Sequence, residues 1–355
     1  MLIRRETNSG ADGLLTTYRP CSVDEFMGNA NTKTILRNYL TSNTLPHVLL
    51  FTGNAGTGKT TLARVLALNL NCENPDGLSP CLVCTSCKST LNLGNMDVTE
   101  VNVGSNNGKA AVESVVKDLS SSPFSRHGVK VIIFDEAHKL TDAAKDLLLK
   151  PMEDCYRHVY LMFCTNQPDK LLGKVKGDNP FLDRCTQMPI GRTTQDETLE
   201  MLENVSQFEG ASYNLDVLTY ISEVVKGVPR KALNSLDLIL AEGSWDLAKA
   251  KELLGNTLID EDDAQIIELS RTLIKRNFKI SCNLFAELAK TYPVESIRVA
   301  VCGFFVGCLK RSNANNGMQL SNALTQLTTP IYLTGKPAEH LFYNVMYKVV
   351  IFLGK

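Results

Sequence analysis

The sequence predicts an α/β domain with a parallel sheet covered by helices, followed by two all-helical domains. Short, apolar, β-branched runs at 48–52, 130–134 and 159–164 alternate with helical patterns in the first half of the chain. From about residue 192 the strand signal stops, and segments with helical periodicity follow. The length of 355 residues independently favours two or three domains.

The individual elements follow from these periodicities. A weaker strand is expected at 96–103, where apolar and polar residues alternate. Helices are expected between the strands, at 59–70, 109–119 and 142–153, and after them, at 193–207, 214–226 and 229–241. A charged stretch at 258–265 then leads to further helices. We therefore predict domains at 1–191, 192–256 and 257–355.

Composition limits the classes of function. The chain is 44% hydrophobic and 21% charged, as in ordinary globular proteins, and no apolar run approaches the roughly 20 residues that span a bilayer. We expect a cytoplasmic protein without membrane contact, because the polar start lacks the apolar segment of a signal peptide. The net charge of −1 argues against general attraction to nucleic acid but leaves room for a local basic surface.

A phosphate-binding loop is predicted at "GNAGTGKT", which fits G-x-x-x-x-G-K-[ST] between an apolar strand and a helix. Glycines at positions such as 53 and 58 let backbone N–H groups surround phosphate oxygens at a helix N-terminus. Lys59 would reach the β- and γ-phosphates, and the Thr60 hydroxyl would ligate Mg²⁺. The alternative is a glycine-rich turn that matches by chance.

Two further strand ends carry polar side chains. The run "KVIIFDEAH" ends on Asp135, which would hold Mg²⁺, and Glu136, which would orient or deprotonate the attacking water. Alternatively, both acids are solvated caps. The strand "VYLMFCTNQP" ends at Thr165 and Asn166, and Asn166 would hold the lytic water unless it merely favours a turn.

Four of the eleven cysteines are crowded into residues 72–87 with the spacing C-x8-C-x2-C-x2-C. Two close Cys-x-x-Cys turns can direct thiolates at one tetrahedral centre, which suits Zn²⁺ in a reducing cytosol. A disulfide or a redox-active pair is the alternative, although the other seven cysteines are scattered like free thiols. The predicted zinc ligands are Cys72, Cys81, Cys84 and Cys87, which would close the site and make it structural.

The order of these motifs resembles an AAA+ ATPase, and four segments resemble clamp loaders more closely. These segments are "TTYRPCSVDEFMGNANTKTIL", "DEAHKLTDAAKDLLLKPMED", "FLDRCTQMPI" and "GVPRKALNSLDLIL". The resemblance covers about residues 16–242 and is strongest to the gamma/tau ATPase subunits of bacterial DNA polymerase III, which carry a zinc module of the same spacing after the first helix. The C-terminal helices are only loosely similar, to the large subunits of phage clamp loaders.

The resemblance implies roles for particular residues. It implies that the Tyr-Arg-Pro and Gly-Asn segments frame the adenine pocket, that Arg230 reaches the nucleotide from the lid, and that Arg184 is an arginine finger for a neighbouring subunit. Asp183 departs from the family's serine and would pair with Arg184. The alternatives are a surface Asp–Arg pair and a solvated Arg230. The full predicted nucleotide set is Tyr18, Arg19, Pro20, Gly28, Asn29, Gly53, Asn54, Ala55, Gly56, Thr57, Gly58, Lys59, Thr60, Thr61 and Arg230.

The resemblance also implies a DNA contact at "NVGSNNGKAAVESVVKDL". Ser105, Asn106 and Asn107 would contact the DNA backbone together with a helix N-terminus. Lys109 lies where these ATPases often carry a basic residue that holds the catalytic glutamate away until DNA draws it off. The alternative is a glycine-containing turn with an exposed lysine.

These expectations favour an ATP-hydrolysing motor subunit of a sliding-clamp loader, with ATP, Mg²⁺ and Zn²⁺ as cofactors. The implied partners are other clamp-loader subunits in a pentameric spiral, the sliding clamp and primer–template DNA. One alternative is a non-catalytic delta-prime-like subunit, which the intact Lys59, Asp135 and Glu136 disfavour. The other is a different AAA+ DNA-remodelling ATPase, which the cysteine spacing and the Asp-Arg-Cys segment disfavour.

Overall fold

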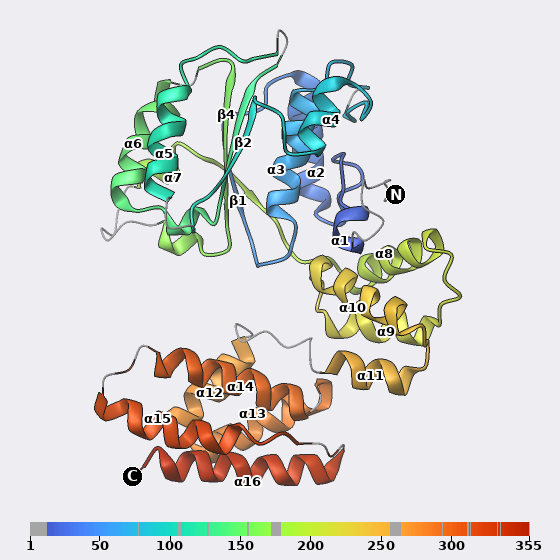
Figure 1. Cartoon of the computed structure of the whole chain (residues 1–355), viewed down its shortest axis with the longest axis vertical. Helices are drawn as coiled ribbons and strands as arrows, with labels where there is room; N and C mark the ends of the chain where they lie inside the picture. The colour runs from blue at the N-terminus through green and yellow to red at the C-terminus, as the bar shows by residue number, and fades with distance from the viewer. Residues whose placement is uncertain are drawn as a thin grey trace. The chain divides into compact units, whose positions relative to one another are not determined.

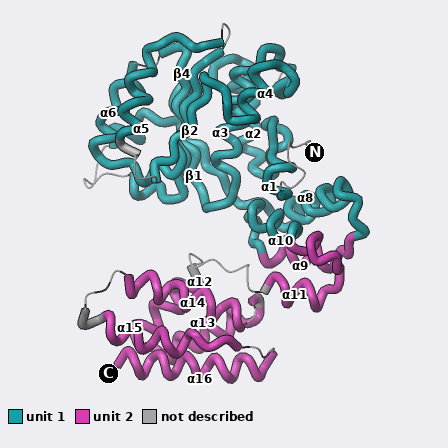
Figure 2. Tube along the Cα trace, in the orientation of Figure 1, with its two compact units in different colours: residues 1–212, 225–237 teal, residues 213–224, 238–355 magenta. Residues whose placement is uncertain are grey.

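The computed structural model divides the chain into two compact units (Figure 2). The first comprises residues 1–212 and 225–237, and the second comprises residues 213–224 and 238–355. The residues that the structure describes are 13–76, 78–104, 108–125, 128–154, 156–171, 179–255, 264–292, 294–310, 312, 314–331, 333 and 335–354. The predicted three-domain boundaries after residues 191 and 256 stay predictions.

The first unit contains a five-stranded, all-parallel sheet with the order β2-β3-β4-β1-β5. Its strands are β1 (Val48–Thr52), β2 (Val98–Asn102), β3 (Lys130–Asp135), β4 (Val159–Thr165) and β5 (Thr186–Pro189). The central strands β1, β3 and β4 are almost wholly buried, as their continuous apolar sequences predict for strands covered on both faces. The predicted doubly wound sheet is confirmed.

Strand β5 is the one strand of this sheet that the sequence patterns missed. It has only four residues, "TQMP", and ends in a proline, so it carries neither an apolar run nor an alternation long enough to recognise. It pairs with β1 at the edge of the sheet, where the missing N–H of Pro189 is tolerated.

Helices cover both faces of the sheet (Figure 1). On one face, β-strand side chains such as Phe134 and Phe163 form a core that includes Leu148 of α6 and Phe181 of α7. On the other face, Leu62 and Leu66 of α3 pack in a core with strand residues. The helices of this α/β part are α1 (Leu14–Thr17), α2 (Ala30–Ser42), α3 (Lys59–Leu70), α4 (Thr85–Leu91), α5 (Gly108–Asp118), η1 (Ala137–Lys139), α6 (Asp142–Asp154), η2 (Pro168–Lys170) and α7 (Pro180–Asp183).

From α8 onward, the described part of the chain contains helices and no strands, as predicted. Residues that favour helix starts stand at the first residues of two of these helices. Thr194 and Glu197 form a capping box at the start of α8, and Pro229 is the first residue of α10. The remaining helices are α8 (Gln195–Phe208), α9 (Leu215–Val224), α10 (Pro229–Glu242), α11 (Leu247–Gly255), α12 (Ala264–Ile274), α13 (Phe278–Thr291), α14 (Val294–Leu309), α15 (Ala314–Leu327) and α16 (Lys336–Phe352).

Within the second unit, helices α12 to α16 pack around aromatic residues. The Phe285 ring lies 4.8 Å from Phe342 and 4.9 Å from Tyr343, centroid to centroid. Several apolar side chains on α14 and α16 nevertheless stay exposed, among them Val299 and Tyr347. Within the described part of the chain, no helix combines the length and the apolar character needed to cross a membrane.

Candidate nucleotide site and cysteine cluster

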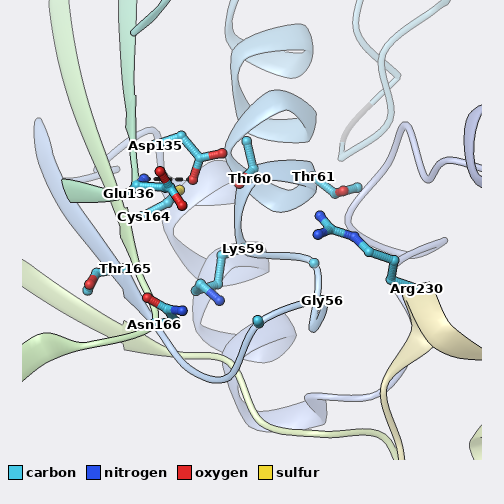
Figure 3. A pocket seen from close by; sticks show the side chains of 12 residues that line it. Gly56, Lys59, Thr60, Thr61, Asp135, Glu136, Cys164, Thr165, Asn166 and Arg230 are labelled. Carbon is cyan, nitrogen blue, oxygen red and sulfur yellow. Dashed lines mark hydrogen bonds between the residues drawn. The ribbon is translucent and has the colours of Figure 1, made fainter. Parts of the chain in front are cut away.

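The candidate nucleotide site lies at the carboxyl edge of the sheet, where parallel strands place the residues that follow them. Strand β1 leads into the loop 53–58, β3 ends at Asp135, and β4 ends at Thr165. Figure 3 shows residues from these three strand ends and Arg230 of α10 around one pocket. The fold therefore brings together motifs that are more than 100 residues apart.

Glycines make the loop 53–58 possible. Gly53 has φ +147°, and a Cβ built on it would lie 2.0 Å from the carbonyl oxygen of Ile190. Gly58 has φ +98°, and a Cβ there would lie 2.7 Å from the ring of Phe26. Larger residues are thus excluded by backbone conformation and by close contacts. Gly58 immediately precedes α3, so the loop ends at the N-terminus of that helix, where the helix dipole is positive.

Lys59 is largely buried and points back at its own loop. Its Nζ donates to the carbonyl oxygen of Gly53 at 2.8 Å and to that of Asn54. Burial lowers the pKa of Lys59 below its ordinary value. These loop carbonyls hold the ammonium group at the pocket, where an anionic phosphate would be a stronger acceptor.

The two acidic residues after β3 differ in conformation. Asp135 ends the strand, and its Oδ1 accepts from the Glu136 amide at 2.9 Å. Glu136 adopts the left-handed conformation, with φ 54° and ψ 40°, which is uncommon for a residue with a side chain. Such backbone strain concentrates at functional sites because the surrounding structure must maintain it. Both carboxylates line the pocket.

The end of β4 contributes Cys164, Thr165 and Asn166 to the same pocket. Thr165 is buried, and its Oγ1 accepts from the Gln167 amide at 3.0 Å and lies 3.4 Å from Nδ1 of His138. Desolvation lowers the pKa of His138. Asn166 carries its amide at the edge of the pocket near Lys59, the position that the sequence predicted for a water-holding side chain (Figure 3).

A second, mostly apolar pocket adjoins the first. The two share four lining residues, namely Gly56, Gly58, Thr61 and Arg230. The apolar pocket is also lined by Leu15, Tyr18, Arg19, Pro20, Phe26, Met27, Thr57, Met201, Pro229 and Leu233. A polar compartment beside an apolar one matches the two ends of a nucleotide, the phosphates and the base.

Most of the predicted nucleotide residues line these two pockets, including the Tyr-Arg-Pro segment and residues 55–61. Gly28, Asn29, Gly53 and Asn54 are not among the lining residues. Instead, the Asn29 side chain accepts from the Gly191 amide at 2.7 Å and donates to the Gly191 carbonyl oxygen at 3.3 Å. Asn29 of the predicted Gly-Asn pair therefore fastens the N-terminal segment to the chain that follows β5.

Arg184 follows α7 and is bound within its own chain. Its Nη2 donates to Oε2 of Glu153 at 2.8 Å, and its Nη1 donates to the carbonyl oxygen of Pro180 at 2.9 Å. The sequence suggested Asp183 as the carboxylate partner. The partner in the structure is Glu153 of α6, because α6 and α7 pack together and bring the two side chains into contact.

The predicted DNA-contacting turn falls mainly outside the described residues. Ser105, Asn106 and Asn107 lie outside them, and for Lys109 the structure describes the backbone position in α5 only. Gly104, the last described residue before this turn, lies beside Glu136, since a Cβ built on it would be 2.4 Å from Glu136 Oε2. The turn thus begins next to the candidate catalytic carboxylate.

The four predicted cysteines form one cluster. Their sulfur atoms all lie within 4.8 Å of one another. Backbone amides donate to the sulfurs: Cys81 N to Cys72 Sγ at 3.2 Å, Cys84 N to Cys81 Sγ at 3.4 Å and Cys87 N to Cys84 Sγ at 3.3 Å. The amides of Val83 and Cys84 lower the pKa of Cys81 to about 6, which favours the thiolate form that metals bind.

This donor set fits a metal ion such as zinc. Tetrahedral coordination with Zn–S bonds of about 2.3 Å places sulfurs roughly 3.8 Å apart, and all four sulfurs of the cluster lie within 4.8 Å of one another. The cluster packs on Cys21 and Leu68 of the α/β part, so it fastens the segment between α3 and β2 to the first unit.

Several pocket residues escaped prediction from sequence. Cys164 and Phe26 lie within or beside quoted motifs but belong to types that usually form cores. Leu233 lies within the quoted segment "GVPRKALNSLDLIL" but was given no role, and Met201 lies in α8, about 140 residues beyond the phosphate loop, where no local pattern marks it. The segment "GVPR" at residues 227–230 was the sequence signal that α10 contributes to the nucleotide site.

Comparisons with known proteins agree with this arrangement. A family model described as "DNA polymerase III, delta subunit" matches residues 28–187. The DNA polymerase III subunit gamma/tau of Mycoplasma genitalium is 32% identical over 222 residues, which are 62% of this chain and 36% of the relative. The subunit tau of Escherichia coli is 28% identical over 265 residues, 74% of this chain and 40% of the relative. The chain therefore spans well under half of either relative.

The fold also resembles a solved AAA+ structure. The Holliday junction branch migration motor RuvB of Thermotoga maritima superposes with a TM-score of 0.51 at 21% identity, covering 72% of this chain and 79% of RuvB. This likeness establishes the fold and nothing about the reaction. Together with the sequence relationship and the cysteine cluster, it makes the chain a gamma/tau-like relative of the DNA polymerase III subunits, with a RuvB-like AAA+ fold.

Proposed function

We propose that the chain is an ATP-hydrolysing motor subunit of a sliding-clamp loader that opens the clamp and places it on primer–template DNA. One observation carries the ATPase part: a single pocket is lined by Lys59, Thr60, Asp135, Glu136 and Arg230. A phosphate loop, two strand-end carboxylates and a lid arginine are the parts that phosphoryl transfer requires. The relationship to gamma/tau subunits supports the clamp-loader part.

ATP would occupy both pockets. The base would enter the apolar part beside Tyr18 and Met201, and the phosphates would reach the polar part. Lys59 would exchange its loop carbonyls for β- and γ-phosphate oxygens, and Arg230 would approach the phosphates from α10. Mg²⁺, when bound by Thr60 and Asp135, would neutralise negative charge on the β- and γ-phosphates.

Hydrolysis would then need an oriented water. Glu136 would accept a proton from this water as its oxygen bonds to the γ-phosphorus, and Asn166 would help to hold it. The bond between the γ-phosphorus and the bridging oxygen breaks, and its electron pair stays with ADP. The reaction is phosphoryl transfer to water, and its free energy would drive changes in the subunit assembly.

The cysteine cluster would hold one structural Zn²⁺. All four donors are protein thiols, which leaves no position for a reacting molecule. The segment that it closes contains one short helix, α4, and would need such a cross-link because it buries little apolar surface of its own.

The partners belong to this proposal as well. We expect other clamp-loader subunits in a pentameric spiral, the sliding clamp, and DNA contacted at Ser105, Asn106, Asn107 and Lys109, in the cytoplasm of a bacterium or an infected host. The delta-subunit family match raises one alternative, a non-catalytic wedge subunit. The intact Lys59 and Glu136 count against it, because a wedge has no need of a complete ATPase site.

An ATPase assay of the purified chain, alone and with candidate partner subunits, clamp and primed DNA, tests the proposal. Lys59→Ala should abolish nucleotide binding or turnover, because it removes the ammonium group that the loop carbonyls hold at the pocket. Lys249→Ala, an exposed lysine on α11, is the control for loss of a lysine. Hydrolysis by Lys59→Ala at the wild-type rate would refute the site assignment.

A further inference from the structure

An arginine that lines neither pocket bonds to the phosphate loop. Arg192 lies between β5 and α8, and it is exposed. Its Nε and Nη2 donate to the side-chain oxygen of Asn54 at 2.9 and 3.0 Å. The Asn54 amide is assigned with this oxygen toward the guanidinium group, because the opposite orientation would place its NH2 group against two further N–H donors. The sequence motifs gave Arg192 no role.

The same guanidinium group also reaches the segment 225–228, which leads into α10. Its Nη1 donates to the carbonyl oxygen of Lys226 at 3.3 Å. The backbone beside Arg192 is fixed to this segment, because the Thr193 amide donates to the carbonyl oxygen of Gly227 at 3.0 Å. A Cβ built on Gly227 would lie 2.0 Å from the Thr193 carbonyl oxygen, so the two segments are in close contact. We call the three hydrogen bonds of the guanidinium group the Arg192 bridge.

Both ends of the Arg192 bridge adjoin groups that line the polar pocket. At one end, the backbone carbonyl oxygen of Asn54 accepts from Nζ of Lys59, so a fixed Asn54 also fixes an acceptor of this ammonium group. At the other end, the Arg230 amide donates to the carbonyl oxygen of Gly56 at 3.4 Å. The start of α10 is therefore joined to the phosphate loop twice, directly at Gly56 and through the Arg192 bridge at Asn54.

The position of the bridge determines what it can contribute to binding. Neither Arg192 nor Asn54 lines the two pockets, so a nucleotide can occupy them without breaking the bridge. A contact that exists before and after binding adds no bond to the ligand. It lowers the free energy lost in ordering the loop and α10 around that ligand. Hydrogen bonds at an exposed site are modest in strength, so we expect a several-fold effect on affinity.

We propose that Arg192 is a positioning residue that preorganises the nucleotide site by joining Asn54 of the phosphate loop to the segment that leads into α10. It keeps Lys59 and Arg230 at the same pocket before a nucleotide arrives (Figure 3). It touches neither the nucleotide nor the attacking water. This inference rests on the nucleotide site of the proposed function, and it adds a residue that acts through the loop and α10.

The first test measures the dissociation constants of ADP and of a non-hydrolysable ATP analogue from the full chain by calorimetry. Arg192→Met should raise both constants about threefold to tenfold, and by the same factor, because the guanidinium group does not contact the γ-phosphate. In steady-state hydrolysis the KM should rise while kcat stays within about twofold of the wild type, as for a loss of uniform binding. Arg192→Lys should recover only part of the affinity, because an ammonium group lacks the planar fork of donors.

A second variant breaks the bridge from the loop side. Asn54→Ala removes the side-chain amide but keeps the backbone carbonyl that Lys59 uses, so it should also weaken the binding of both nucleotides. Combined with Arg192→Met, it should weaken binding little more than Arg192→Met alone, because the two substitutions remove one shared contact. Arg37→Met is the matched control and should leave both constants unchanged. Nε and Nη2 of Arg37 likewise donate to one side-chain oxygen, Asp24 Oδ1, outside both pockets.

Each opposite result overturns the inference. Unchanged dissociation constants for Arg192→Met would make the bridge a surface contact only, and weaker binding of the ATP analogue with normal binding of ADP would place the guanidinium group at the γ-phosphate. Fully additive effects of Arg192→Met and Asn54→Ala would show that the two residues do not act through their contact. Failure of the proposed hydrolysis looks different, because a chain that binds nucleotides without hydrolysing them would still show the effect of Arg192 on both constants.

Discussion

Arg184 and Glu153 form an ion pair at 2.8 Å that joins the end of α7 to the last turn of α6. The Nε atom of the same guanidinium is buried without a hydrogen-bond partner. Arg184 is thus only partly satisfied within its own chain, and its side chain remains about one-third exposed. An arginine in this state can exchange a carboxylate for a phosphate without losing much of its bonding.

Arg184→Ala should therefore leave ATP affinity nearly intact while reducing DNA- and clamp-stimulated turnover by about a hundredfold or more, as expected for a finger supplied to a neighbouring subunit. Mixing it with Lys59→Ala protein should recover some activity, because an Arg184→Ala site can then receive an intact finger. The measurement is steady-state ATP hydrolysis in reconstituted assemblies. Full activity of Arg184→Ala alone, or of a strictly monomeric sample, would mean that the site is complete within one chain.

Glu136→Gln should bind ATP but hydrolyse it at least about a hundredfold more slowly, because the amide cannot accept the proton of the attacking water. The protein should then remain in its ATP-bound, DNA-gripping assembly, measurable as slow dissociation from primed DNA. Glu252→Gln is a useful comparison, since it changes an exposed carboxylate on α11, away from the pocket and from Arg184. Rapid turnover by Glu136→Gln would remove Glu136 from the mechanism.

Zinc should be present at about one ion per chain, and Cys84→Ser should lose it. Cys84 is an especially sensitive position, because its sulfur also accepts from the Cys87 amide and caps α4. Elemental analysis and thermal unfolding, with and without a chelator, give the measurement. Cys282→Ser, a half-buried cysteine outside the cluster, should keep the metal. Zinc-free protein with an unchanged melting temperature would contradict a structural ion.

Lys109→Ala should raise ATP hydrolysis without DNA or reduce the stimulation that DNA gives. The physical reason is electrostatic, since a lysine at the start of α5 would contact the DNA backbone, and such contacts weaken with added salt. The measurement compares the basal and the DNA-stimulated rates of ATP hydrolysis at two salt concentrations. If both rates match the wild type at either salt concentration, Lys109 is an exposed lysine without a role in sensing.

Gly53→Ala should destabilise the protein by about 2–3 kcal/mol, because the methyl group would lie 2.0 Å from the backbone oxygen of Ile190, which cannot move without breaking β5 from β1. Gly210→Ala is the control that shows how much stability is lost through a positive φ alone. Gly210 also has positive φ, at 66°, but nothing lies within 4 Å of the added methyl group. Chemical denaturation of both variants is the measurement. Equal losses of stability would show that the close contact at Gly53 costs nothing.

Local motifs accounted for much of the fold and of the polar half of the site. The phosphate loop, the acids after β3 and the four cysteines each lie within about sixteen residues, so spacing alone specifies their relative positions once the strand or helix forms. Central strands were recognisable because burial on both faces requires continuous apolar runs. Strand β5 is too short to show a pattern of this kind, and no sequence pattern indicates that the Asn29 side chain bonds to the backbone of Gly191.

The sequence by itself therefore determined which chemical groups are present and that they follow buried parallel strands. Tertiary structure decided which distant groups meet: Met201 and Leu233 beside Tyr18 in the apolar pocket, Glu153 rather than Asp183 on Arg184, and Gly104 under Glu136 and Lys139. These contacts depend on how helices and strands pack, at distances of a few ångströms, and packing is a property of the whole sheet and its covering helices. A periodicity of 2 or 3.6 residues specifies the buried face of an element but not the neighbour that covers it.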